Sequence, residues 1–291
     1  MNDLAEQAGL EGGAYLASAF TPAFVVGNIG ITLLGPLFVA ILSWWSLSER
    51  LIFMKQFFTV LGGMGTLATE SYCRLLDERT PTYRDQDYLD YIVLNHATVP
   101  DRTEWILDHQ KPDYNPLLIE DIQQITPLKP EFFVLICNTA HYAFDRLQAA
   151  TSIPILNMLQ ETVNEIKNIA PHAKRVGVLA TRGTIASGLY DSYIQNAGYE
   201  EVKPTPAILD ATEDLIYHDI KEAGHSDGKK FHELVRTMIE DQKCDVVILG
   251  CTELSYANEM NPETEFPVAD SQSIIVNRSL ARALAIRNGN Q

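Results

Sequence analysis

Residues 54–63 read MKQFFTVLGG and decide the fold, because a short apolar run there leads directly into two glycines. We expect a buried strand at residues 57–61, followed by a tight glycine turn. Strand, turn and helix in that order are the natural start of an α/β protein.

The same kind of apolar run recurs further along the chain. The expected strands are residues 91–94, 132–136, 175–179 and 246–249. Continuous Val/Ile/Leu/Phe blocks of this length are typical of parallel sheets that are buried on both faces.

Amphipathic segments lie between these strands. One helical face is marked by Leu159, Val163, Ile166 and Ala170, a second by Phe231, Leu234, Val235 and Met238, and a last helix by Ile274 and Ala281. Alternation of strands and helices predicts a doubly wound α/β fold with parallel sheets.

A weak internal repeat divides the chain. VLGGMGT at residues 60–66 is similar to VLATRGT at 178–184, and FVLICNT at 133–139 is similar to VILGCTE at 247–253. Two pseudo-symmetric lobes facing each other would explain it, with residues 54–150 and 262–291 in the first lobe and 151–261 in the second. Chance similarity of two generic βα units is the alternative.

Composition excludes several classes of protein. The chain has 291 residues, with 22 Lys+Arg against 38 Asp+Glu, and a formal net charge of -16. This acidity argues against a general nucleic-acid binder, which needs clustered basic residues. The four cysteines are too few for a disulfide scaffold and lack zinc-finger spacing, so we expect no metal.

Residues 1–53 form an apolar extension with no charged side chain between positions 12 and 48. Residues 23–45 are long enough to span a bilayer, and the basic flank that follows would leave the rest of the chain on the cytoplasmic side. Gly27, Gly30 and Pro36 weaken such a helix. Three interpretations remain: a membrane anchor within residues 14–45, an extension upstream of a misplaced start at Met54, or a packed accessory segment.

Two cysteines carry the expected chemistry. Cys137 and Cys251 each follow a strand and precede Thr or Asn-Thr and helix-compatible sequence, which is where open α/β sheets place ligands. A helix N-terminus would lower a thiol pKa and attract a carboxylate. Two thiols on opposite sides of a cleft suit inversion at a carbon next to a carboxylate, since one removes a proton while the other donates one. Cys73 and Cys244 fit ordinary packing.

From residue 54 to about residue 287 the chain resembles the aspartate/glutamate racemase family, closest to its aspartate racemases. Six motifs in order carry the resemblance: GGMG at 62–65, NH at 95–96 followed by PDRT at 100–103, CNTAH at 137–141, LATRGT at 179–184, IY at 216–217 with IK at 220–221, and GCTE at 250–253. Thr66 departs from the family, which usually has Pro there, and the apolar extension is foreign to it.

The resemblance implies a racemase that uses no PLP or other cofactor, has its active site between two lobes and is commonly a homodimer. It assigns Cys137 and Cys251 as the catalytic acid/bases, and Arg102 and Lys221 as the cations that hold the side-chain carboxylate of an acidic amino acid. The remaining substrate-binding candidates, for the α-carboxylate and α-amino group, are Met64, Asn138, Thr139, Thr181 and Thr252.

Competing interpretations attach to several of these residues. Arg102 is also typical of a helix-start ion pair, Lys221 of a solvated helix charge, and Thr181 of a helix N-cap. His141 and Glu253 lie near the thiols, and two roles are open for them: tuning the thiols or taking part in proton exchange, and supporting the structure around them. The structural role is the favoured interpretation for both. His96 is expected to be a turn residue.

The predicted activity is therefore interconversion of L- and D-aspartate, with glutamate as a possible substrate. The alternatives are another isomerase or decarboxylase acting on an α-substituted acid, or a silent, membrane-anchored amino-acid-binding protein. Required free thiols predict a reducing, cytoplasmic compartment.

Overall fold

The computed structural model describes residues 56–289, and the interpretations of residues 1–53 lie outside this part of the chain. Two four-stranded parallel sheets form its framework. The first has the order β2-β1-β3-β4, with strands β1 (Phe58–Gly62), β2 (Tyr91–Asn95), β3 (Phe133–Leu135) and β4 (Ile155–Leu156). The second has the order β6-β5-β7-β8, with strands β5 (Arg175–Leu179), β6 (Glu200–Val202), β7 (Val246–Leu249) and β8 (Val268–Asp270).

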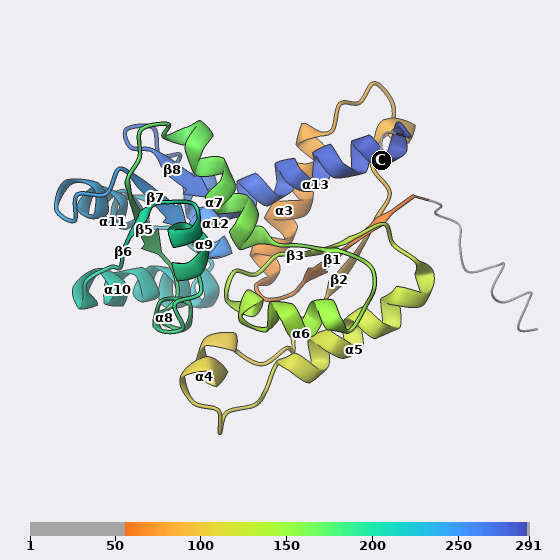
Figure 1. Cartoon of the computed structure of the whole chain (residues 1–291), viewed down its shortest axis with the longest axis horizontal. Helices are drawn as coiled ribbons and strands as arrows, with labels where there is room; N and C mark the ends of the chain where they lie inside the picture. Colours follow the sequence, from red (N-terminus) through yellow and green to blue (C-terminus); the bar gives the residue numbers. More distant parts are fainter. Residues whose placement is uncertain (1–55, 290–291) are drawn as a thin grey trace, which may run out of the picture. The chain divides into compact units, whose positions relative to one another are not determined.

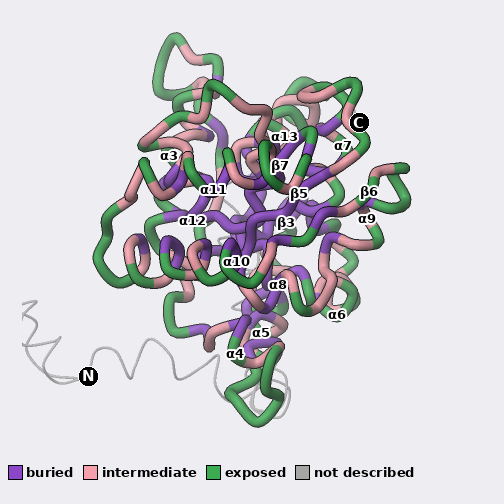
Figure 2. The backbone as a smooth tube through the Cα atoms, turned by 90° about the vertical axis from the view of Figure 1, so that its left-hand side faces the viewer, coloured by how far each residue is buried: buried purple, intermediate pink, exposed green. Residues whose placement is uncertain are grey.

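The two sheets therefore share one topology, in which the first strand of each half lies between the second and the third. This identity confirms the predicted two-lobed α/β fold and makes the internal repeat a structural one. Strands β1, β3 and β7 are buried along their whole length, as expected for strands inside a parallel sheet that is covered on both faces. Figure 2 shows the buried backbone gathered around β3, β5 and β7.

Helices cover both sheets (Figure 1). Those of the first lobe are α3 (Thr66–Arg79), α4 (Arg102–Leu107), α5 (Asn115–Ile125) and α6 (Phe144–Ala149), with 3-10 turns η1 (Asp85–Asp87), η2 (Thr126–Leu128) and η3 (Thr139–Ala143). Those of the second are α8 (Arg182–Ala186), α9 (Asp191–Asn196), α10 (Pro206–Glu213), the π-helix η4 (Asp214–Glu222), α11 (Gly228–Glu240) and α12 (Thr252–Met260).

The last helix of each half crosses to the other lobe. Helix α7 (Met158–Ile169) follows β4, yet its apolar side chains Leu159 and Val163 pack in one buried cluster with Val176 of β5. Helix α13 (Ser271–Arg287) follows β8, and its Ile275 packs in a cluster with Phe58 of β1. Figure 1 shows α13 running from β8 to α3. The two lobes are thus interlocked.

The expected lobe boundaries are wrong for two short strands. Residues 155–156, expected in the second lobe, pair with β3 in the first sheet. Residues 268–270, expected in the first, pair with β7 in the second. The reason is the crossover, since strand and following helix belong to different lobes. Asn157 and Asp270 mark the equivalent points, because each caps its helix by accepting a hydrogen bond from a backbone N–H.

Between residues 56 and 289, none of the helices is both long and apolar enough to cross a bilayer.

Candidate active site

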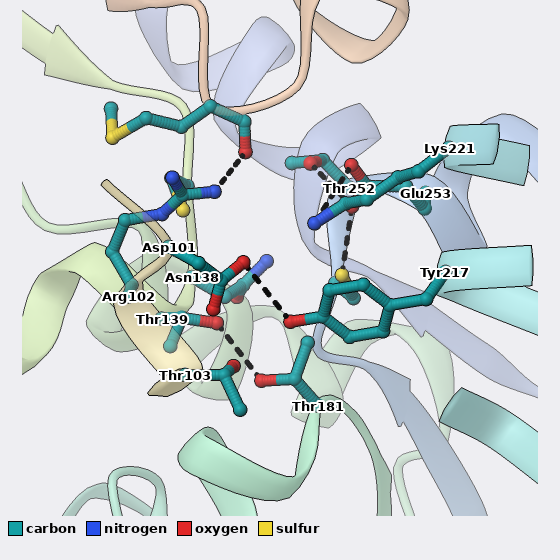
Figure 3. A pocket seen from close by; sticks show the side chains of 13 residues that line it. Asp101, Arg102, Thr103, Asn138, Thr139, Thr181, Tyr217, Lys221, Thr252 and Glu253 are labelled. Carbon is teal, nitrogen blue, oxygen red and sulfur yellow. Dashed lines mark hydrogen bonds and ion pairs between the residues drawn. The ribbon is translucent and has the colours of Figure 1, made fainter. Parts of the chain in front are cut away.

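A pocket of about 250 Å³ lies at the carboxyl ends of the central strands of both sheets. All nine residues predicted for the site line it (Figure 3). The full lining is Met64, Asp101, Arg102, Thr103, Cys137, Asn138, Thr139, Thr181, Tyr217, Lys221, Cys251, Thr252 and Glu253. The strand-end turns of both lobes therefore converge on one site, as the repeat predicts.

Cys137 follows β3 and is 5% exposed. Its backbone is held by His141, whose Nδ1 donates to the Cys137 carbonyl at 2.8 Å while Nε2 accepts from the Met158 N–H at 3.1 Å. Burial lowers the pKa of His141 to about 4, so the imidazole is neutral at neutral pH and both of its nitrogens are occupied. His141 thus supports the turn, as the sequence suggested, and does not line the pocket.

Cys251 caps the N-terminus of α12 and is also 5% exposed. Its thiol donates a hydrogen bond to Glu253 Oε2 at 2.8 Å. Burial raises the pKa of this thiol well above its usual value, and the Glu253 carboxylate raises it further, against the opposing charge of Lys221. The helix N-terminus was expected to lower the thiol pKa at this position. The backbone N–H of Glu253 at this helix terminus does lower the pKa, but burial and the neighbouring carboxylate outweigh it.

Arg102 is the first residue of α4 and is 8% exposed. Its Nη1 donates to the carbonyls of Val99 and Pro100, and its Nη2 to the carbonyl of Met64 at 3.0 Å. A guanidinium has five N–H donors, so the Nε–H and one Nη2–H remain. Nε is buried and has no partner among the described residues. Arg102 is therefore a pocket residue with two unused N–H donors, and not a member of a surface ion pair.

Lys221 lies across the pocket on η4 and is 24% exposed. Its Nζ is 3.8 Å from Glu253 Oε1 and 4.3 Å from the centre of the Tyr217 ring. Burial lowers the pKa of this amine, but the charges of Glu253 and of Cys251 outweigh burial and hold the pKa above its usual value. Lys221 is thus a positive charge facing the site, not a solvated helix residue.

Hydroxyl and amide groups form the floor between the lobes. Thr139 Oγ1 is 3.1 Å from Thr181 Oγ1 and 3.0 Å from Thr184 Oγ1. Thr181 is also the predicted N-cap, because its Oγ1 accepts from the Thr184 N–H at 3.3 Å. The Asn138 amide is occupied on both sides: it donates to Ser271 at 2.9 Å and accepts from Tyr190 at 2.6 Å.

Four lining residues were not predicted as site residues: Asp101, Thr103, Tyr217 and Glu253. Asp101 N-caps α4, and the Tyr217 hydroxyl donates to its Oδ2 at 3.4 Å, which links the two lobes across the pocket (Figure 3). Burial raises the pKa of Tyr217 above its usual range, so the hydroxyl stays protonated. The spacing of Tyr217 and Lys221, four residues apart, was the available signal, since such residues share a helix face.

The other candidates lie elsewhere. Cys73 and Cys244 belong to hydrophobic clusters outside the pocket, and burial raises the pKa of each thiol to about 11. His96 pairs with Asp121 at 2.9 Å, away from the pocket lining. Among the described residues, no three His, Cys, Asp or Glu side chains converge as metal ligands would.

Known structures share this architecture. Aspartate racemase from Picrophilus torridus aligns with a TM-score of 0.65 and 24% identity, over 78% of this chain and 95% of that one. Glutamate racemase from Francisella tularensis, solved with D-glutamate, aligns with a TM-score of 0.52 and 18% identity, over 81% of this chain and 82% of its own. The fold is that of these two racemases.

The sequence comparisons agree. Residues 61–278 match the model of the Asp/Glu/hydantoin racemase family, so the chain belongs to that family and is an amino-acid racemase, an isomerase. The broad specificity amino-acid racemase RacX of Bacillus subtilis is 27% identical over 79% of this chain and 99% of its own length. Glutamate racemase of Aquifex aeolicus is 30% identical over a shorter region, 42% of this chain and 46% of that enzyme.

Proposed function

We propose that this enzyme interconverts L- and D-aspartate by proton transfer at Cα between Cys137 and Cys251. One observation carries the proposal: two thiols from equivalent turns of the two lobes line a single small pocket together with Arg102 and Lys221. In each direction one thiolate removes the α-proton and the other thiol delivers a proton to the opposite face. No net proton is gained or lost by the substrate.

The side-chain carboxylate is assigned to Arg102. Its unpartnered Nε–H and spare Nη2–H can make two charge-assisted hydrogen bonds to one carboxylate, and Lys221 adds positive charge from the opposite wall. The three carbonyls that hold the guanidinium keep it fixed before substrate arrives, which lowers the entropy cost of binding.

The α-carboxylate and α-amino group are assigned to the hydroxyls of Thr139, Thr181 and Thr252, with Met64 and the already occupied Asn138 amide packing beside them. Burial of these groups excludes water, which strengthens the electrostatic stabilisation that a weakly acidic Cα–H requires.

Aspartate is preferred to glutamate in this proposal because the motifs around Cys137 and Cys251 resemble those of aspartate racemases. Glutamate is one methylene longer, a difference worth about 1–3 kcal/mol in a fitted pocket. All four cysteines are free, and the proposed reaction requires Cys137 and Cys251 in reduced form. Both points support a reducing compartment such as the cytoplasm. The homodimer expected from the family resemblance remains a prediction.

The test is substrate selectivity of the Arg102→Lys variant. Lysine retains the charge but cannot offer two parallel donors. We expect kcat/KM for aspartate to fall by about 10- to 100-fold, which corresponds to the loss of one charged hydrogen bond, with little change for a neutral amino acid. Arg236→Ala, in an exposed ion pair on α11, is the control and should leave both values unchanged. An equal loss for acidic and neutral substrates would remove Arg102 from carboxylate recognition.

A further inference from the structure

Two-base racemisation leaves the enzyme in a different protonation state from the one in which it started. After one turnover, the thiol that gave its proton is a thiolate and the thiolate that took one is a thiol. Before the same enantiomer can react again, each sulfur must exchange a proton with solvent. A buried thiol therefore needs a path along which its proton can leave and return.

Glu253 is placed on such a path. It is 4% exposed, and its Oε2 accepts the hydrogen bond from the Cys251 thiol. Its other oxygen, Oε1, faces Lys221 at 3.8 Å. Figure 3 shows Glu253 and Lys221 together on the wall of the pocket.

A second, larger pocket lies on the far side of this wall. Its volume is about 600 Å³, and Glu253 and Lys221 line it as well as the active-site pocket. The other lining residues are Gly65, Thr66, Leu67, Ala68, Ile220 and Tyr256, of which Leu67 is 41% exposed. We call this second cavity the outer pocket.

Gly65 makes room for the carboxylate between the two pockets. A Cβ at this position would lie 2.5 Å from Glu253 Oε1. Its backbone is ordinary, with φ -138, so space rather than conformation accounts for the glycine. In the equivalent turn of the second lobe, Gly183 faces Thr103 instead of a carboxylate. The gap beside Glu253 is thus a feature of one half only.

We propose that Glu253 carries the proton of Cys251 between the active-site pocket and the outer pocket; the proposal rests on the two-thiol racemisation described above. The Cys251 S–H bond breaks, its proton passes to Glu253 Oε2, and the thiolate remains. A half-turn about the Cγ–Cδ bond brings the protonated oxygen to the outer pocket, where water takes the proton. The same steps in reverse protonate Cys251, and nothing is oxidised or reduced.

Loss of this proton transfer should affect kcat and kcat/KM differently. Proton return follows product release, so it contributes to kcat but not to kcat/KM for a single enantiomer, which reports the steps from free enzyme to the committed reaction. A residue that only positions Cys251 would instead slow the chemical step and lower both. The α-deuterium isotope effect on kcat distinguishes the cases, because it vanishes when proton return limits turnover and persists when chemistry does.

The experiment measures initial rates of the Glu253→Gln variant with each enantiomer of aspartate, protiated and deuterated at Cα. We expect kcat to fall about tenfold or more, kcat/KM to change by less than about threefold, and the isotope effect on kcat to approach 1. Imidazole, a small proton carrier, should raise kcat of the variant without raising kcat/KM. An equal loss in kcat and kcat/KM with a persisting isotope effect would overturn the relay.

Gly65→Ala gives an independent test because it leaves Glu253 in the sequence. The new methyl group should push the carboxylate away from Cys251 and reproduce the selective loss of kcat, again with rescue by imidazole. Unchanged kcat in a folded Gly65→Ala variant would contradict the relay. Failure of the proposed function itself has a different signature: no aspartate racemisation by the wild-type enzyme, or full activity without Cys251.

Discussion

At the scale of single residues, Cys137 and Cys251 occupy equivalent positions but have unequal neighbours. The internal repeat aligns Thr139 with Glu253, two residues after each cysteine. Thr139 directs its hydroxyl to Thr181 and Thr184, whereas Glu253 accepts a hydrogen bond from the thiol. Among the described residues, Cys251 is the only cysteine whose thiol is hydrogen-bonded to a carboxylate. The pseudo-symmetry of the fold therefore does not extend to the proton chemistry of the two thiols.

His141 should make folding stability depend on pH. Its pKa is about 4 in the folded protein, below its usual value of 6.5, so the unfolded chain binds more protons between these values. The contribution is fully present above pH 6.5 and is lost as the pH falls toward 4. A shift of this size corresponds to about 3 kcal/mol. Urea denaturation of wild type and His141→Gln at several pH values should show a flatter profile for the variant; parallel profiles would contradict a buried neutral imidazole.

At the scale of elements, the site depends on how closely the turns of the two lobes approach. Helix α8 meets α4 at Gly183, where a Cβ would lie 2.8 Å from Thr103 Cα and 3.0 Å from its Oγ1. The contact involves backbone, so it cannot be relieved by rotating a side chain. Because Gly183 has no side chain, α4 can lie this close to α8, and this close approach positions Arg102 on α4.

Gly183→Ala should move α4 away from the pocket. We expect a destabilisation of about 1–3 kcal/mol from overpacking, together with a loss of kcat/KM for aspartate as Arg102 is displaced. Thermal unfolding and steady-state kinetics measure the two effects. Gly228→Ala is the matched control, because the three atoms nearest its added methyl group all belong to the side chain of Asn261, and neither residue lines the pocket. Wild-type activity in Gly183→Ala would show that this approach does not position the site.

The elements also show what sequence patterns can and cannot predict. Strands β1, β2, β3, β5 and β7 were predicted because each is a continuous apolar block with enough residues to be distinctive. Strands β4, β6 and β8 were missed, since two or three residues carry no periodic signal. Strands β4 and β8 each follow a proline. The two prolines are themselves part of the repeat, because IPILN at residues 153–157 corresponds to FPVAD at 266–270.

Within the site, motifs at strand ends were predicted well because the topology of parallel sheets brings those ends together. The residues that each motif contacts were harder to predict from the sequence. That Arg102 donates to the carbonyl of Met64, or that burial outweighs the helix N-terminus at Cys251, depends on contacts between segments far apart in sequence. Such contacts follow from packing and not from local pattern.

At the scale of the whole molecule, the exchanged helices α7 and α13 join the lobes into one cooperative unit. Each buries its apolar face against the lobe that does not contain the preceding strand. Arg278 of α13 bonds to Glu165 of α7 at 2.6 Å, so the two crossing helices also contact each other. Neither lobe has a complete core without a helix from the other half of the chain.

Removing core volume from α13 should therefore destabilise both lobes together. Ile275 is fully buried, and Ile275→Ala is expected to cost about 2–5 kcal/mol. Native-state hydrogen exchange should show protection falling equally in β1 and β3 of the first sheet and in β5 and β7 of the second. Leu107→Ala, at a side chain that is 49% exposed, serves as the control. Loss of protection confined to the first sheet would mean that the lobes unfold independently.

The acidic net charge of -16 has to be reconciled with an acidic substrate. Long-range fields are screened over about 8 Å at physiological salt, so local groups decide binding inside a pocket. Arg102 and Lys221 supply that local positive charge on opposite walls.

The central claim, that two thiols act on opposite faces of Cα, is tested most directly by α-hydrogen exchange in deuterated water. Cys137→Ser and Cys251→Ser should each lose racemisation, while each remaining thiol still exchanges the α-hydrogen of the one enantiomer that faces it. NMR of L- and D-aspartate incubated with each variant should therefore show exchange of opposite enantiomers by the two variants. Exchange of the same enantiomer by both, or full racemisation by either, would contradict the two-thiol mechanism.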